Sequence, residues 1–158
     1  MGGFKWAYVL VALVLTGLAG VYANIMVAGA PGVPGSPDDP DQVALGKVVY
    51  AETCAACHGD NLQGETPDWK VRKEDGSLPA PPHDTSGHTW HHDDFLLFDY
   101  VKLGGQALMP EGVISAMPGF ADQLTDDQIW AVLAFIKSHW TLEARQRQAE
   151  MTKRAKKG

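Results

Sequence analysis

The sequence predicts an all-α fold preceded by a membrane helix. Two segments, at residues 42–53 and 126–140, carry apolar side chains at the spacing of an amphipathic helix. The stretch 59–92 between them is rich in proline and shows no strand-like alternation. A length of 158 residues suits one modest domain with appendages, and it excludes two large domains or a repeat array.

The N-terminal segment predicts a membrane anchor over residues 1–29. No charged residue occurs from position 6 to position 29, and a helix of that length spans about 35 Å, enough to cross a bilayer core of about 30 Å. Lys5 precedes the segment and aspartates follow it, so the N-terminus is expected in the cytoplasm and the rest outside. The alternative is a signal peptide cleaved after Ala23. The apolar run is longer than such peptides need, which favours an uncleaved signal-anchor.

Three regions follow the anchor. Residues 30–41 are rich in proline and glycine, and they predict a short extended linker. Residues 42–141 predict the globular domain, and residues 142–158 a basic tail that we expect to be solvated. Residues 31–141 have a net charge of −11 and the tail has +4, within a whole-chain net charge of −6. This acidic balance argues against a nucleic-acid partner, which requires a basic surface, and it suits either solubility or steering toward a basic partner.

Three helices of the domain have recognisable ends. The first opens with an Asp-Pro pair at residues 39–40 and leads to the cysteine at position 54. The second is expected over residues 94–103, where two glycines stop it. The third opens with a capping box at residues 125–128 and continues to about residue 140. A core this thin requires a covalent staple or a bound cofactor.

Cys54, Cys57 and His58 form a C-x-x-C-H motif, the pattern of covalent haem attachment. The two thiols can each form a thioether with one haem vinyl group, and the adjacent imidazole can then bind the iron. A zinc site would need further cysteine or histidine ligands at fixed spacing, and the sequence has no other cysteine. A redox dithiol would need a βαβ context, which is missing. The motif therefore predicts one covalently attached haem c.

Methionine is the common sixth ligand in haem electron carriers. Of the five methionines, Met109 and Met117 lie in the domain between the second and third helices, and both precede a proline. Met117 stands just before the C-terminal helix, where a loop can carry its sulfur across the open haem face. We favour Met117, with Met109 as its competitor, and either methionine could instead fill a gap in the core.

These features resemble the class I c-type cytochromes over about residues 42–140. Gly46 and Tyr50 match the family's Gly-x-x-x-aromatic pattern, in which the glycine allows close helix contact, and Phe135 matches the aromatic residue of its C-terminal helix. The segment 115–120 resembles the family's Met-Pro axial loop, which supports Met117. The resemblance implies the cytochrome c fold, with N- and C-terminal helices crossing around one covalent haem. The segment 64–92 departs from the small soluble members.

Five histidines lie outside the attachment motif, and three of them cluster beside Trp90. Their spacing is poor for a second copper or zinc site, because adjacent side chains point apart. We expect the cluster to cap the helix that begins at residues 93–94, or to bind a haem propionate together with Trp90. Replacement of Met117 by one of these imidazoles is a lesser alternative, which would lower the reduction potential. The five histidines are His83, His88, His91, His92 and His139.

A covalently held, six-coordinate haem leaves no open iron position for a substrate. This predicts a one-electron carrier, and the N-terminal segment predicts that a single helix anchors it in the cell inner membrane with the haem domain on the periplasmic side. Its expected partners are membrane-bound donor and acceptor complexes of a respiratory or photosynthetic chain, and the lipid bilayer. No acid–base pair, nucleophile or phosphate loop predicts an enzyme. The alternatives are a fixed subunit of an oxidase or dehydrogenase, a five-coordinate peroxidase or sensor, and an assembly element with a structural haem.

Overall fold

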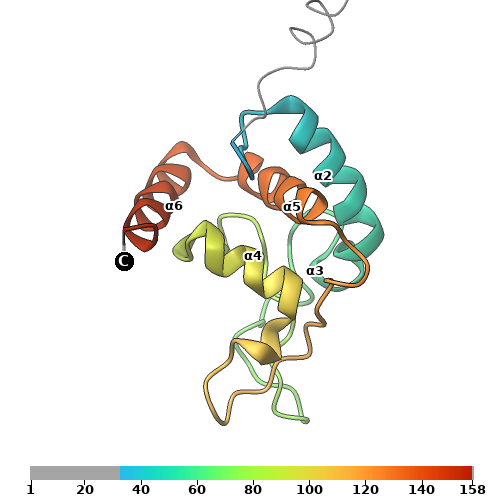
Figure 1. The fold of residues 1–158 in the computed structure, drawn as a ribbon. Coiled ribbons are helices and arrows are strands. Elements are labelled where there is room, and N and C mark those ends of the chain that lie inside the picture. The colour runs from blue at the N-terminus through green and yellow to red at the C-terminus, as the bar shows by residue number, and fades with distance from the viewer. Residues whose placement is uncertain (1–32, 158) are drawn as a thin grey trace, which may run out of the picture. The chain divides into compact units, whose positions relative to one another are not determined.

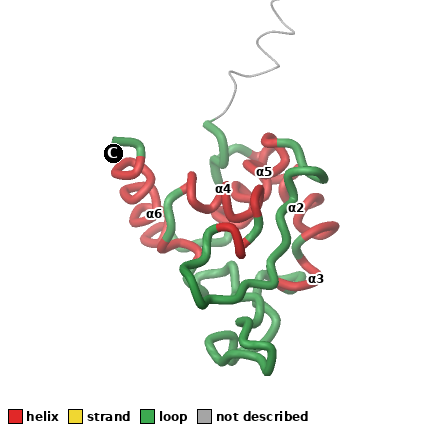
Figure 2. Tube along the Cα trace, turned by 60° about the horizontal axis from the view of Figure 1, so that its bottom comes forward, coloured by secondary structure: helices red, strands yellow, loops and turns green. Residues whose placement is uncertain are grey.

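Helices joined by long loops build residues 33–157, the part of the chain that the computed structural model describes (Figure 1). This part contains no strand, and Figure 2 shows only helix and loop along it. An isolated parallel bridge joins Ser77 to Ile114. The all-α prediction is therefore confirmed for the described residues. In chain order, the elements are α2 (Pro40–Thr53), α3 (Ala55–His58), η1 (Thr89–His91), α4 (Asp94–Leu103), η2 (Gly105–Ala107), α5 (Asp126–Ser138) and α6 (Leu142–Ala155).

The membrane helix expected over residues 1–29 lies outside the described residues. Among residues 33–157, none of the helices combines the length and the apolar character needed to cross a bilayer. Of the expected linker, residues 33–39 precede α2 and form turns.

Helix α2 begins where the sequence predicts. The side chain of Asp39 accepts hydrogen bonds from the backbone N–H groups of Asp41 and Gln42, and Pro40 occupies the first helical position. An aspartate cap satisfies donors that the first turn leaves open, and proline there loses no hydrogen bond. The helix then continues without interruption to Thr53, directly before the first cysteine.

Helices α2 and α5 form the most extensive helix–helix contact of the described chain, and α5 crosses α2 in Figure 1. Gly46 faces the backbone of Ala131, and a Cβ at position 46 would lie 2.9 Å from the Cβ of Phe135. The rings of Tyr50 and Phe135 pack with their centroids 5.3 Å apart. The predicted glycine contact and its two aromatic partners are therefore confirmed.

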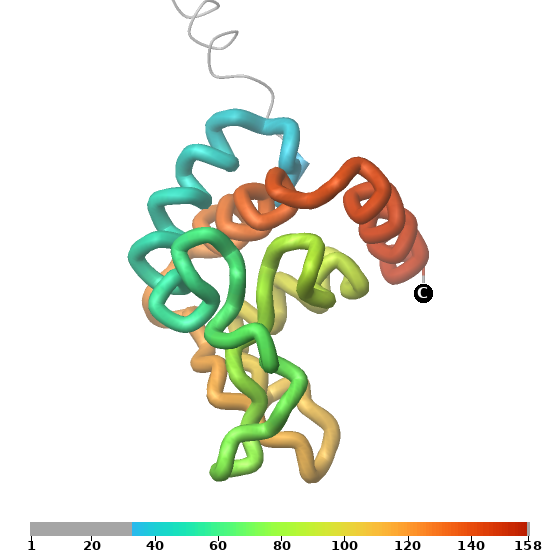
Figure 3. The backbone as a smooth tube through the Cα atoms, turned by 180° about the vertical axis from the view of Figure 1, so that it is seen from behind, coloured from blue at the N-terminus to red at the C-terminus, as the bar shows by residue number. Residues whose placement is uncertain are grey.

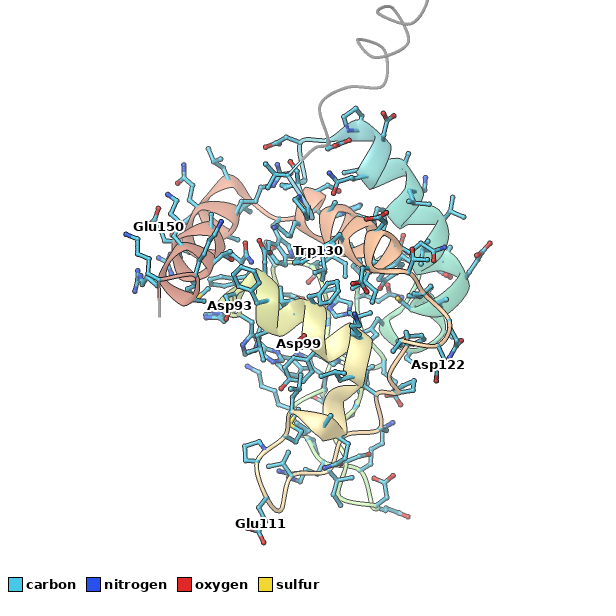
Figure 4. The ribbon with its side chains drawn as sticks, in the orientation of Figure 1. Asp93, Asp99, Glu111, Asp122, Trp130 and Glu150 are labelled. Atoms are coloured by element: carbon cyan, nitrogen blue, oxygen red, sulfur yellow. The ribbon has the colours of Figure 1, made fainter. Side chains whose placement is uncertain are left out.

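Helix α4 spans Asp94–Leu103, as predicted, but its cap differs from our expectation. The side chain of Asp93 accepts from the backbone N–H groups of Phe95 and Leu96, so no histidine caps this helix. A carboxylate at this position is the better cap, because it accepts two hydrogen bonds and carries a negative charge at the positive helix end. On the α5 side, the Phe98 ring stacks on Trp130, which Figure 4 labels, at a centroid distance of 4.6 Å.

The basic C-terminal segment, which we expected to be a solvated tail, forms a helix with one packed edge, and the basic residues within 153–157 are exposed. Helix α6 starts after the cap Thr141, and it packs against η1 and α4. Gln148 is buried and donates to the carboxylate of Asp94 at 2.7 Å. The same carboxylate accepts from Lys137 of α5 at 2.8 Å, with both charged side chains largely buried. One aspartate of α4 thus joins α5 and α6.

Two loops, at residues 64–80 and 105–116, extend together away from the helices (Figure 3). The first is closed by a hydrogen bond from the Glu65 N–H to the Ala80 carbonyl, at 2.9 Å. Glu111 lies at the tip of the second loop (Figure 4). The insertion predicted near residues 64–92 is therefore largely an irregular loop, which leads the chain back toward the helices at residue 81.

Candidate functional site

The three motif residues lie at the end of α2, where the chain bends into α3. The N–H of Cys54 continues the α2 hydrogen bonding to Tyr50, and the N–H of His58 donates to the Cys54 carbonyl at 2.9 Å. Gly59 then ends the short helix with a φ of 79°, a conformation that glycine adopts readily. Both thiols are free; Cys57 is exposed, whereas Cys54 is half-buried. Burial raises the pKa of the Cys54 thiol.

His58 is buried, and one edge of its imidazole is fixed. Its Nδ1 lies 2.9 Å from the carbonyl oxygen of Pro81. A carbonyl oxygen only accepts, so Nδ1 carries the proton and Nε2 keeps its lone pair. Burial also lowers the pKa of His58, which favours the neutral ring. The imidazole is therefore in the form that binds a metal through Nε2.

The contact with Pro81 was not predicted from the sequence, because it joins residues 23 positions apart through an irregular loop. Two hydrogen bonds anchor the loop just after Pro81. In the first, the His83 N–H donates to the Leu62 carbonyl at 2.8 Å. Trp140 donates its indole N–H to the His83 carbonyl, also at 2.8 Å. The proline-rich run at residues 79–82 is the sole sequence signal near this contact.

Met117 lies on a loop that is fixed to the end of α4. Its carbonyl accepts from the Gly105 N–H at 3.0 Å, and the Phe120 N–H donates to the Val101 carbonyl at 3.0 Å. Gly104 has a φ of 86°, and a Cβ there would lie 2.6 Å from the backbone nitrogen of Gly119. The backbone at the end of α4 therefore packs directly on the backbone around Met117, which holds the methionine in place.

The two candidate methionines differ in their surroundings. The side chain of Met117 is half-buried and packs against the hydrophobic core. Met109 lies in the extended loop 105–116 and is outside the residues that pack on this core. The structure thus brings Met117, rather than Met109, to the body that also holds the C-x-x-C-H motif.

The histidine cluster forms aromatic contacts. The ring of His88 stacks on Trp69 with centroids 5.0 Å apart, and it meets His92 edge-on at 5.3 Å. His91 packs against Trp90 at 3.7 Å. Over residues 33–157, no three side chains of the Cys, His, Asp and Glu types are grouped as metal ligands. The described contacts of the cluster are contacts between rings.

The residues present fit a covalently bound haem. Two free thiols lie three positions apart, followed at once by a neutral imidazole with an available Nε2. The indole N–H of Trp90 is buried and has no acceptor among the described protein atoms. Trp90 lines a pocket with Thr85, Thr141 and Arg147, beside α6 rather than beside the motif residues.

A family model described as Cytochrome c matches residues 43–140. The chain belongs to the cytochrome c family. As a member, this cytochrome carries covalently attached haem c, and its domain transfers electrons. The match ends before α6, so the C-terminal helix lies outside the part that the family model describes.

Curated relatives are similar to parts of this cytochrome. The chain is 39% identical over 69 residues to the "Cbb3-type cytochrome c oxidase subunit CcoP" of Azospirillum sp. (strain B510), covering 44% of this chain and 22% of that protein. It is 32% identical over 99 residues to the "Thiosulfate dehydrogenase" of Stutzerimonas stutzeri (strain A1501), covering 61% of this chain and 27% of that protein. The chain thus spans about a quarter of the length of these relatives. No solved structure matches it significantly.

Proposed function

We propose that this cytochrome is a membrane-anchored monohaem carrier that passes single electrons between membrane-bound complexes of a respiratory or photosynthetic chain. The observation that carries the proposal is the C-x-x-C-H motif at the end of α2, where Pro81 holds His58 with Nε2 available. When bound, the haem supplies one-electron exchange between ferrous and ferric iron. Transfer of a single electron requires no acid, base or nucleophile from the chain, and we assign no residue to such a role.

Each site residue has a distinct task in this proposal. The thiols of Cys54 and Cys57 add to the two haem vinyl groups and form thioether bonds, which hold the cofactor to α2 and α3. His58 binds the iron through Nε2, because Nδ1 is engaged by Pro81. Met117 would offer its thioether sulfur to the iron, and a thioether raises the reduction potential relative to a second histidine.

The choice of Met117 is tested by comparing two matched variants of the holoprotein. Met117→Ala should remove the sulfur-to-iron charge-transfer band of the oxidised protein and lower its midpoint potential. Met109→Ala should leave both unchanged, because Met109 lies outside the core that Met117 contacts. If Met109→Ala alone removes the band, the assignment is reversed. If the wild-type protein lacks the band, methionine ligation is excluded: a low-spin haem would then indicate a second histidine ligand, and a high-spin haem a five-coordinate peroxidase or sensor.

We also propose that residues 1–29 are an uncleaved single-pass anchor, which places the haem domain on the periplasmic side of the inner membrane. The uncharged run of residues 6–29 supports this. Membranes washed with alkaline carbonate should retain the full-length cytochrome, and protease added to spheroplasts should digest the haem domain. N-terminal sequencing that starts after Ala23 would instead establish a cleaved signal peptide.

A fixed subunit of a larger oxidase or dehydrogenase is the second candidate. The similarity to two subunits of cbb3-type oxidases favours it. A roaming carrier should separate from other complexes after mild detergent extraction. Co-purification with one complex at constant stoichiometry would establish the fixed subunit. In either case, rapid reduction by a quinol-oxidising complex would exclude a purely structural haem.

A further inference from the structure

A second histidine covers the face of the proposed iron ligand. The imidazole rings of His58 and His83 are stacked, with centroids 3.9 Å apart and planes inclined by 20°. The two residues are far apart in the sequence, and the loop through residues 59–82 brings them together. The sequence motif for haem attachment makes no use of His83.

His83 is held by hydrogen bonds on its backbone and on its ring. Its N–H donates to the Leu62 carbonyl, and its carbonyl accepts from the indole of Trp140, both at 2.8 Å. The ring Nδ1 lies 2.9 Å from the hydroxyl of the buried Thr89. The backbone position and the ring plane are therefore both fixed, so the ring is a rigid surface for its neighbour.

His58 is thus restrained in two directions by one short segment. Pro81 binds the Nδ1 edge of the imidazole, and His83 covers one face. A hydrogen bond at the edge alone permits the ring to rock about the axis of that bond. A flat ring stacked on the face opposes that rotation.

We propose that His83 is a positioning residue, which fixes the plane of the His58 imidazole at the iron and thereby sets the electronic properties of the haem. This inference rests on the proposed role of His58 as an axial ligand. Groups that contact a metal ligand commonly orient it and tune the metal. The orientation of an axial imidazole determines how its π orbitals overlap those of the iron, so a group that fixes this orientation acts on the electronic structure of the haem.

Three variants of the full-length holoprotein test the proposal. His83→Leu places an apolar side chain of similar size at the position and removes the flat ring. His83→Phe keeps a flat ring and removes the bond to Thr89. Thr89→Val leaves His83 in place and frees the edge of its ring. The readouts are the g-values of the oxidised low-spin haem by electron paramagnetic resonance and the midpoint potential.

We expect His83→Leu to change both the g-values and the potential, and His83→Phe to restore the g-values toward those of the wild type. Thr89→Val should shift the g-values in the same direction as His83→Leu, by a smaller amount. A merely structural role would alter stability and leave the g-values in place. The proposal is overturned if His83→Leu has wild-type g-values and potential, or if His83→Phe departs from the wild type as far as His83→Leu.

The test also separates failure of the proposed His83 role from failure of the variant to fold and from failure of the proposed haem ligation. If His83→Leu fails to assemble, Thr89→Val decides, and unchanged g-values in that variant reject the proposal. If the wild-type protein shows no histidine-ligated low-spin haem, the proposed function itself fails. A wild type with that signal and an unaffected His83→Leu variant rejects only the role of His83.

Discussion

Gly46 of α2 lies against the carbonyl group of Ala131 in α5, with no space for a side chain between the two helices. A Cβ at position 46 would lie 2.5 Å from the carbonyl carbon of Ala131 and 2.9 Å from the Cβ of Phe135. These are backbone and backbone-attached atoms, so neither can rotate away. The helices must separate to admit even one methyl group, and this contact supports the helix end that carries the haem motif.

Gly46→Ala should therefore destabilise the cytochrome. Alanine gains about 1 kcal/mol of helix propensity over glycine, but overpacking a tight contact costs about 1–3 kcal/mol or more. We expect a net loss of about 2 kcal/mol in the free energy of unfolding, measured by denaturant titration of the holoprotein with helical circular dichroism. Val48→Ala, at an exposed position of the same helix, is the control and should change stability by less than about 0.5 kcal/mol. Equal stability of Gly46→Ala and the wild type would contradict the packing argument.

The helix ends were predictable because the signals that set them are local. Thr125 caps α5 and exchanges hydrogen bonds with Gln128, three residues away. The start of α4 was predicted as well, although its cap was assigned to histidines. The packing of residues 142–155 as a helix was not predicted, for a different reason. The charged composition of this segment suggested solvation, whereas its burial depends on Gln148 meeting Asp94, 54 residues away.

The residues of the site also fall into those that local sequence signals predict and those that depend on contacts between distant segments. The attachment motif is contiguous, so Cys54, Cys57 and His58 were found from spacing alone, and Met117 was favoured from its place before the C-terminal helix. The restraints on His58 come from Pro81 and His83, across a loop without periodic structure. No spacing rule relates such residues, because the path of an irregular loop is set by contacts with the folded helices.

The ion pair between Lys137 and Asp94 should respond unequally to removal of its two partners. Lys137 has an 8% exposed side chain, and Asp94 is its acceptor. Asp94→Asn leaves a buried ammonium without a counter-charge, a change that costs about 3–5 kcal/mol. Lys137→Met leaves a carboxylate that still accepts from Gln148 and lies at a helix N-terminus, so we expect about 1 kcal/mol. Denaturant unfolding of the two holoproteins measures the difference, and an equal or larger loss in Lys137→Met would refute this account.

Helix α6 should loosen when its buried amide is removed. Gln148→Ala deletes the hydrogen bond to Asp94, and we expect a loss of about 1–3 kcal/mol. Local opening of α6 should also speed tryptic cleavage within residues 145–157, which limited proteolysis and mass spectrometry can locate. Gln146→Ala is a matched control, because it makes the same change at an exposed position of the same helix. Similar cleavage rates in the two variants would show that the buried amide does not anchor α6.

The indole nitrogen of Trp90, which is buried although the residue is half-exposed, provides a test of whether a haem propionate reaches it. Its N–H has no acceptor within the described part of the protein, and a buried donor left unpaired costs about 1–3 kcal/mol. If a haem propionate is the acceptor in the holoprotein, Trp90→Phe should lower the free energy of unfolding by about 1–3 kcal/mol and shift the midpoint potential, because a donor to a charged carboxylate is lost. Trp69→Phe, the same change at a partly exposed indole, should shift neither. If no acceptor is present, Trp90→Phe removes an unpaired donor, and the holoprotein should be as stable as the wild type or more so.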